Sequence, residues 1–239
     1  MKMLMVGCEY AGTTTLAVEM SRWIDRVMGG AIHGGLAFHD HHKLLEGGHV
    51  GTKGVPENRP EDDEDNLGFS TRHRQSYKHY TMSYHLAPTF FADPHHLMVG
   101  MHFDDEIYGP KYLGYGEDQA DLLRKLSVHA EHKMLEYGPD LVLVLVKASP
   151  DVIRRRMKEN PHPHPLVTED NVEAILARFE ELYGHSHLGT LARRFVLDTS
   201  ASTVEETMAE FADQIKKRLS DTDRLRILSR RMLRLPTTA

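Results

Sequence analysis

The chain has 239 residues with a formal net charge of −6, and Cys8 is its one cysteine. An acidic balance argues against a broad nucleic-acid surface, which needs an excess of Lys and Arg, and a lone cysteine rules out an internal disulfide framework. Hydrophobic residues at 40% and charged residues at 27% are ordinary globular values, so wholesale disorder is not expected. No apolar run approaches the roughly 20 residues of a membrane span, and the segment Met1–Leu16 makes a poor signal peptide. The composition therefore predicts a cytoplasmic protein with no membrane or nucleic-acid partner.

Short apolar runs alternate with amphipathic stretches along most of the chain. The clearest strand is Leu141–Val146 (LVLVLV), which is apolar on both faces and is therefore expected at the centre of a sheet. Apolar runs predict further strands at Met3–Val6, Ala31–Phe38, Leu97–Phe103 and Phe195–Leu197. Helical periodicity and helix-start residues predict helices at Leu16–Val27, Arg74–Phe91, Glu117–Tyr137, Val152–Lys158, Thr168–Tyr183 and Val204–Leu219. This alternation predicts an α/β fold in which helices cover both faces of a parallel sheet.

A single domain is expected over residues 1–220. Within it, residues 47–69 hold most of the turn residues and an acidic run, which predicts a surface loop. The remaining residues, 221–239, form a C-terminal tail that is either a basic helix packed on the domain or a frayed end.

The segment Gly7–Thr15 (GCEYAGTTT) lies between the first expected strand and the first expected helix. Its glycines at the first and sixth positions, followed by hydroxyl residues, match the frame of a Walker A loop, in which backbone N–H groups and a helix N-terminus hold phosphate oxygens. Thr14 falls where such loops place a Mg²⁺ ligand, whereas Thr13 stands where the pattern has lysine. Either another cation replaces that lysine, or catalysis is weak, or the loop holds something else. Nucleotide phosphate is expected to bind at Gly7, Ala11, Gly12, Thr13, Thr14 and Thr15.

On this loop and the order of its elements, the chain resembles the P-loop kinases of the nucleoside and nucleoside-monophosphate group, with thymidylate kinases the most familiar similar type. The resemblance runs loosely from Met3 to Leu219, and only the loop is motif-like. It implies a P-loop NTPase-like three-layer sandwich with a five-stranded parallel sheet, ATP and Mg²⁺ as cofactors, and an acceptor site at the ends of the strands. It also implies a lid with arginines after the fourth strand, for which residues 150–168 are the candidate.

Acidic residues follow two of the expected strands, at the edge where open parallel sheets bind ligands. Asp40 follows the second strand, where the resemblance suggests a base toward the acceptor hydroxyl; a helix N-cap is the alternative. Asp104 and Glu106 follow the third strand and are candidates for binding the acceptor. Asp104 is also a candidate Mg²⁺ ligand, although such acids are also common in solvated turns and helix caps. Tyr108 and Tyr112 beside them could stack on a base or simply anchor packing. Thymidylate kinases have an Asp-Arg pair here, and the missing arginine leaves room for an uncharged acceptor such as a nucleoside.

Three consecutive arginines, Arg154 to Arg156, follow the clearest strand. Because successive helical residues point about 100° apart, at most two of them can face one site. We expect Arg154 or Arg155 to neutralise the transferring phosphoryl group, as a kinase lid does, and partly to replace the missing lysine. A solvated helix face is the alternative, and Lys111 and Lys147 are other candidate cations.

These residues predict an ATP- and Mg²⁺-dependent small-molecule kinase that phosphorylates a nucleoside, a nucleotide or a similar alcohol. A homodimer is compatible with the sequence. Two alternatives stay open: a nucleotide-binding protein that is catalytically weak or inactive, and a metal-dependent phosphohydrolase built on the acids and the 17 histidines.

Overall fold

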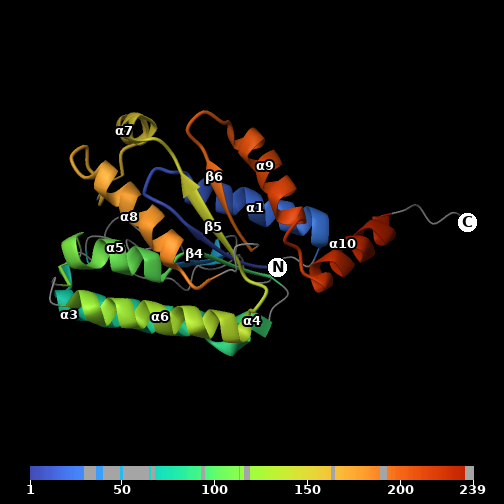
Figure 1. The fold of residues 1–239 in the computed structure, drawn as a ribbon, viewed down its shortest axis with the longest axis horizontal. Helices are drawn as coiled ribbons and strands as arrows, with labels where there is room; N and C mark the ends of the chain where they lie inside the picture. Colours follow the sequence, from blue (N-terminus) through green and yellow to red (C-terminus); the bar gives the residue numbers. More distant parts are fainter. Residues whose placement is uncertain are drawn as a thin grey trace, which may run out of the picture.

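The computed structural model describes residues 1–29, 36–39, 49–50, 65, 68–92, 95–112, 114–115, 119–162, 165–188 and 193–234. Within these residues the strands form one sheet in the order β3-β2-β4-β1-β5-β6. Helices cover both faces of this sheet, which makes a three-layer α/β sandwich (Figure 1). The predicted fold class is confirmed.

Five strands run parallel, as expected: β2 (Leu36–His39), β4 (His96–Gly100), β1 (Lys2–Val6), β5 (Val142–Lys147) and β6 (Arg194–Asp198). A short strand, β3 (His49–Val50), pairs antiparallel with β2 at one edge. β1 lies between β4 and β5, with Leu4 in register with Met98 and Leu143. The side chains from Val142 to Val146 are all buried, because helices cover both faces of a central parallel strand.

The helices form two layers (Figure 1). One layer holds α1 (Thr13–Met28) and α9 (Val204–Lys216), with α10 (Asp221–Arg234) against α1. The other layer holds α3 (Thr71–His85), α5 (His102–Tyr112), α6 (Ala120–Tyr137) and α8 (Val172–His185). Of the remaining helices, α4 (Pro88–Ala92) precedes β4, and α7 (Pro150–Glu159) lies beyond the carboxyl end of β5. The carboxyl ends of β1 and β5 therefore meet the start of α7 at one edge of the sandwich.

Local sequence explains where two of these helices begin. Ser149 caps α7 by accepting a hydrogen bond from the Val152 N–H, and Pro150 lies in the first turn, as the sequence predicted. Thr203 and Glu206 form a capping box at the start of α9. Both caps satisfy backbone N–H groups that the helix itself leaves unpaired.

Two elements differ from the sequence prediction. The helix expected at Arg74–Phe91 is two helices, α3 and α4, because Pro88 has no N–H and disfavours helical geometry at the residue before it. The strand expected to reach Phe103 ends at Gly100, where Gly100 and Met101 have left-handed φ values of 75° and 52°. Asp104 and the acid after it therefore lie in the first turn of α5, where the helix N-terminus favours negative charge.

The segment that follows α9 is a helix packed on the domain, which was one of the two interpretations of the tail. Asp223 of α10 is buried and forms an ion pair with the Met1 amine at 2.9 Å. Across the described part of the chain, no helix has the length and apolar character needed to cross a membrane.

Candidate functional site

The N-terminal loop, residues 7–12 between β1 and α1, has glycine at two positions that disfavour a side chain. A Cβ on Gly7 would lie 2.3 Å from the Val146 carbonyl oxygen, so a larger residue would push β1 away from β5. Gly12 has a φ of +97°, in the left-handed region that favours glycine, and it is the N-cap of α1. The first turn of α1 therefore begins at Thr13 with no side-chain cap on its N–H groups. A strand, a glycine loop and an uncapped helix end together form an arrangement suited to binding an anion.

Backbone oxygens of the N-terminal loop are tied to the neighbouring elements. Thr199, directly after β6, donates its hydroxyl to the Ala11 carbonyl at 2.9 Å. Arg156 of α7 donates from Nη1 to the Tyr10 carbonyl at 2.9 Å and to Thr199 Oγ1 at 3.0 Å, and from Nη2 to the Thr199 carbonyl at 2.9 Å. The loop, α7 and the end of β6 thus share one hydrogen-bond network.

Arg156 is the member of the arginine triplet that donates to the N-terminal loop. Its Nη1 lies 4.0 Å from the position of a Cβ on Gly12. Burial, followed by the charge of Arg155, lowers the pKa of Arg156 from its ordinary value, yet a guanidinium remains charged in proteins. The sequence carries a signal for this position, because Arg156 follows the apolar residues Val152 and Ile153 at helical spacing. It therefore lies on the same face of α7 as these two residues, which are buried.

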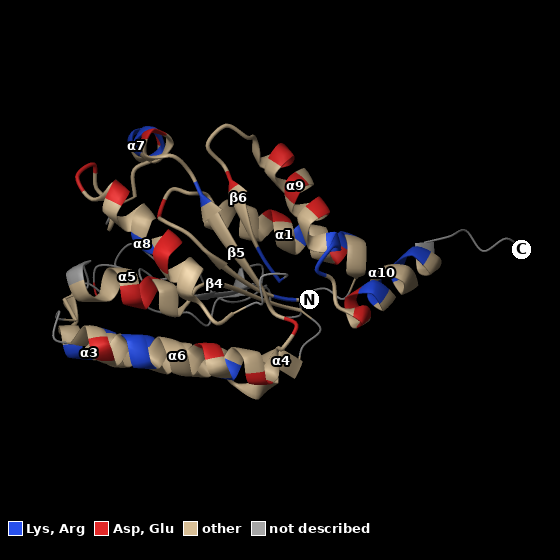
Figure 2. Ribbon diagram, in the orientation of Figure 1, with Lys and Arg blue, Asp and Glu red and all other residues tan. Residues whose placement is uncertain are grey.

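The two arginines predicted to be catalytic have other partners. Arg154 forms an ion pair with Glu173 of α8, with 2.6 Å between Nη2 and Oε1, and also donates to the Glu169 carbonyl. Arg155 is exposed and its Nε lies 3.8 Å from Glu159 Oε1 on the same helix. Figure 2 shows basic residues gathered on α7, beyond the strand ends. Action of Arg154 or Arg155 on a phosphoryl group would require the loss of these partners and stays a prediction.

Two of the predicted acceptor-site and metal residues, Asp104 and Tyr108, lie one helical turn apart on α5, and Tyr108 contacts the N-terminal loop. The Glu9 N–H donates to the Tyr108 hydroxyl at 3.3 Å. Burial raises the pKa of Tyr108 well above its ordinary value, and Cys8 and Asp104 raise it further. Burial likewise raises the pKa of the Cys8 thiol, and the charges of Glu9 and Asp104 act in the same direction. Asp104 therefore lies close enough to the loop for its charge to act there.

Glu106 makes a contact that sequence reasoning missed. Its Oε1 lies 2.8 Å from Nη2 of Arg178, which comes from α8, and the same guanidinium pairs with Glu181 through Nη1 at 2.7 Å. The sequence has no arginine next to the acids of α5, but the fold brings one to Glu106 from another helix. No local pattern marks Arg178, because it lies among other charged residues on an ordinary amphipathic helix.

Three other candidates from the sequence fall partly or wholly outside the description. Asp40 lies outside the described residues, and so do the side chains of Lys111 and Tyr112. Lys147 is the other candidate cation, and its Nζ lies 3.4 Å from Oε1 of Glu180 on α8. The proposed roles of Asp40 and Tyr112 stay predictions.

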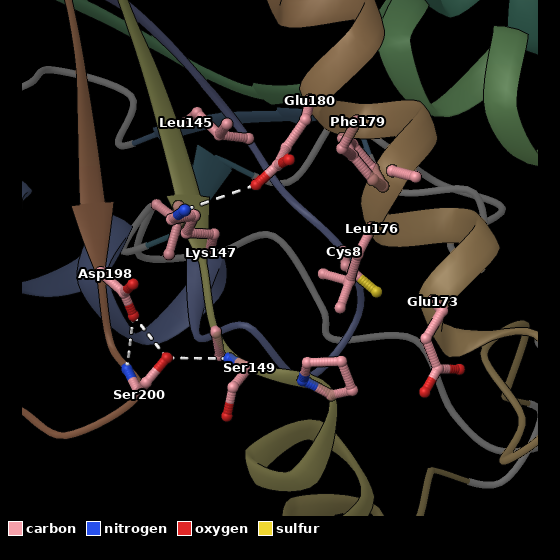
Figure 3. A pocket seen from close by; sticks show the side chains of 14 residues that line it. Cys8, Leu145, Lys147, Ser149, Glu173, Leu176, Phe179, Glu180, Asp198 and Ser200 are labelled. Atoms are coloured by element: carbon pink, nitrogen blue, oxygen red, sulfur yellow. Dashed lines mark hydrogen bonds and ion pairs between the residues drawn. The ribbon is translucent and has the colours of Figure 1, made fainter.

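A cavity of about 360 Å³ lies between α8 and the carboxyl ends of β5 and β6 (Figure 3). Cys8 and Phe179 form part of its wall, and the Lys147–Glu180 ion pair crosses from β5 to α8 beside them. Ser200, which hydrogen-bonds both Asp198 and the Ser149 N–H, lines the β6 side. The residues of the first turn of α1 do not line this cavity, so it is a space beside the candidate anion site rather than the site itself.

A dedicated metal centre is not evident in the part of the chain that the structure describes, where no three His, Cys, Asp or Glu side chains gather. The phosphohydrolase alternative therefore gains no support from these residues. A Mg²⁺ ion bound mainly by phosphate oxygens and water does not need such a cluster.

Comparison with known proteins finds likeness in structure and not in sequence. No protein-family model matches the chain, and no curated protein matches it by sequence. A structure of deoxyadenosine kinase from M. mycoides with bound dATP superposes with a TM-score of 0.58 at 13% identity, over 90% of this chain and 100% of that one. A second structure of this kinase, with the products dCMP and a flexible dCDP, gives a TM-score of 0.54 at 13% identity, over 90% of this chain and 99% of that one. The chain therefore shares the α/β fold of this deoxyadenosine kinase.

Proposed function

We propose that the chain is an ATP- and Mg²⁺-dependent kinase of a small alcohol, with a nucleoside as the first acceptor to test. The observation that carries the proposal is the uncapped first turn of α1, behind a loop with glycine at Gly7 and Gly12. N–H groups at such a helix end bind phosphate oxygens, and the helix dipole adds partial positive charge. In this proposal the β- and γ-phosphates of ATP lie on the backbone of residues 11–14.

Thr14 and Asp104 are the residues that fit a Mg²⁺ ion. Thr14 is exposed in the first turn of α1, and the charge of Asp104 acts on Cys8 in the adjoining loop. Both side chains offer oxygen, and one or two protein oxygens suffice when phosphate and water complete an octahedral shell. A bound Mg²⁺ ion supplies charge neutralisation across the phosphates.

Arg156 supports the proposal because it brings a guanidinium to a loop that lacks lysine at Thr13. In phosphoryl transfer the protein acts chiefly by positioning groups and stabilising charge. We assign Arg156 to orienting the loop and adding positive potential there. Arg154 and Arg155 stay candidates for the transferring group itself, provided that phosphate replaces their glutamate partners.

The acceptor is proposed to bind beside α5. Tyr108 touches the N-terminal loop, and Glu106 with Arg178 supplies polar groups for an acceptor. Asp40 as the base and Tyr112 as a stacking ring complete this part of the proposal. Deoxynucleosides head the acceptor panel because the structurally similar enzyme is a deoxyadenosine kinase, and dTMP belongs in it because of the resemblance to thymidylate kinases. A homodimer and a cytoplasmic location stay predictions.

The first test measures nucleotide binding by titration calorimetry. We expect Thr14→Ala to weaken Mg²⁺-dependent ATP binding on the order of tenfold, as loss of one oxygen ligand or hydrogen bond would. Thr13→Ala, its neighbour and matched control, should have a smaller effect. Equal and small effects would argue that the loop holds no metal-bound nucleotide.

The second test measures turnover. Transfer of labelled phosphate from ATP to a deoxynucleoside, a nucleoside or a monophosphate would support a kinase and identify the acceptor class. Binding of MgATP without transfer to any acceptor would identify a binding protein that lacks catalysis. Absence of binding would refute both.

A further inference from the structure

Glu9 and Tyr10, in the N-terminal loop, extend to a segment more than 150 positions away in sequence. That segment, residues 160–162 with 165–167, follows α7 and precedes α8, and is here called the lid segment. Glu9 Oε2 accepts hydrogen bonds from the Leu166 and Val167 N–H groups, each at 2.9 Å. Its other oxygen, Oε1, lies 2.9 Å from Nδ1 of His162. One carboxylate thus makes three contacts to the lid segment.

Tyr10 adds a second set of contacts to the same segment. Its hydroxyl accepts a hydrogen bond from the His162 N–H at 3.0 Å. Its ring stacks on the His162 imidazole, with 4.2 Å between ring centroids and 23° between the planes. The loop therefore grips the lid segment through both a carboxylate and an aromatic ring.

The environment of Glu9 makes its contacts strong. Its side chain is only 13% exposed, and hydrogen bonds from backbone N–H groups to a carboxylate are shorter and stronger than neutral ones. The Val167 side chain is fully buried in the core, and the N–H of the same residue donates to Glu9. Opening the lid segment would uncover this valine and leave a half-buried carboxylate to find new partners.

The same loop is also attached to the helix that leads into the lid segment. Arg156 of α7 donates to the Tyr10 carbonyl, so the loop contacts both the lid segment and the helix that precedes it. By contrast, Lys158 Nζ lies 3.0 Å from Glu169 Oε1, and this ion pair does not involve the N-terminal loop. Both side chains are exposed. An exposed pair of this kind contributes little.

We infer that Glu9 is a positioning residue that fastens the lid segment to the N-terminal loop, so that opening of this segment is controlled by the Glu9 hydrogen bonds. The fastening does not depend on the identity of the ligand. Where it concerns nucleotide, the inference rests on the proposed function: a nucleotide on the loop can leave only as fast as the lid segment opens.

Hydrogen exchange of the Leu166 and Val167 amides tests the fastening without any ligand. We expect Glu9→Ala to raise the exchange rate of these two amides on the order of 100-fold, because two charge-assisted bonds are lost. Glu9→Gln keeps an acceptor oxygen, so it should restore most of the protection, leaving the rates within about tenfold of the parent. Glu169→Ala and Glu169→Gln make the same chemical changes two residues beyond the lid segment, at an exposed side chain, and should leave both amides unchanged.

Two results would overturn the inference. One is unchanged exchange at Leu166 and Val167 in Glu9→Ala; the other is a rise of equal size at core strand amides, which would mean general destabilisation. If Glu9→Ala fails to fold, Glu9→Asp decides. It keeps the charge on a shorter side chain that reaches the Leu166 and Val167 N–H groups less well, so the exchange of these two amides should rise while β5 amides stay protected.

Stopped-flow measurement of the association and dissociation rates of a fluorescently labelled ATP analogue, with Mg²⁺ present, then tests whether the lid segment controls nucleotide release. We expect Glu9→Ala to raise both the association and dissociation rates about tenfold or more, with a smaller change in affinity, and Glu9→Gln to restore the slower rates. Faster amide exchange with an unchanged dissociation rate would overturn the inference that the lid segment controls nucleotide release. If the parent binds no analogue, the proposed function fails, while the exchange experiment still judges the fastening.

Discussion

The two ends of β1 use polar groups in opposite ways. At its carboxyl end, Glu9 and Tyr10 bind a lid segment through hydrogen bonds, and His162 on the far side is 41% exposed. At its amino end, the Met1 amine pairs with Asp223 at 2.9 Å, and the two side chains are 2% and 5% exposed. His95 completes the second cluster, with its two ring nitrogens 2.8 Å from the same amine and 3.1 Å from the Gly29 carbonyl.

The difference shows which end can change. Charges buried at the amino end lose their partners only if α10 leaves α1, and an uncompensated buried charge is costly. The contacts at the carboxyl end join loops that water can reach, so they can break one at a time. We therefore assign the amino end to stability, and the carboxyl end is the one at which the proposed function places the ligand.

The largest expected effect comes from breaking the buried pair at the amino end. Asp223→Ala should lower the free energy of unfolding by about 3–5 kcal/mol, because it leaves a buried amine without its counter-charge. Asp221→Ala, an exposed acid in the same helix turn, should change it by less than about 0.5 kcal/mol. Urea unfolding measures both. Similar values for the two variants would mean that the amino end carries no special share of the stability.

The next effect is a pH dependence at the same end. Burial, and then the positive charge of the Met1 amine, lower the pKa of His95 from 6.5 to about 4. Between these values the unfolded chain binds the proton more readily than the folded chain, so stability falls as the pH is lowered through this window. The loss should total about 3 kcal/mol, since one pKa unit is worth about 1.4 kcal/mol.

Unfolding measured from pH 7 to pH 4 in the parent and in His95→Asn checks this expectation. The variant lacks the titrating ring, so its stability should vary less over the window, whatever its absolute value. Parallel curves for the two proteins would count against the role of His95.

The smallest of the three effects lies at the carboxyl end and should leave stability nearly intact. Arg156→Ala removes the guanidinium that donates to the Tyr10 carbonyl, and we expect phosphoryl transfer to fall on the order of 100-fold. Arg154→Ala removes the partner of Glu173 and provides the comparison. A larger loss of transfer in Arg154→Ala would favour the cation predicted from the sequence over the one that contacts the loop.

The framework of the fold follows from local patterns. The run Leu141–Val146 predicts a central strand because only a strand covered on both faces is apolar throughout. Gly7 and Gly12 mark the loop because each stands where the backbone disfavours a side chain, through a close carbonyl in one case and a positive φ in the other. The predicted end of β4 was wrong by a few residues. The left-handed backbone conformation of Gly100 and Met101 ends the strand, and it leaves no strong signal in an apolar run.

The sequence by itself thus determined the α/β class, the parallel sheet and the position of the glycine loop, since each depends on residues close together in the chain. Only the tertiary structure decided which side chains meet that loop. Arg156 rather than its two neighbours donates to it, Arg178 comes to Glu106 from α8, and Glu9 binds the lid segment. Each of these contacts joins segments far apart in sequence, and its partner is set by how strands and helices pack, which no local periodicity records.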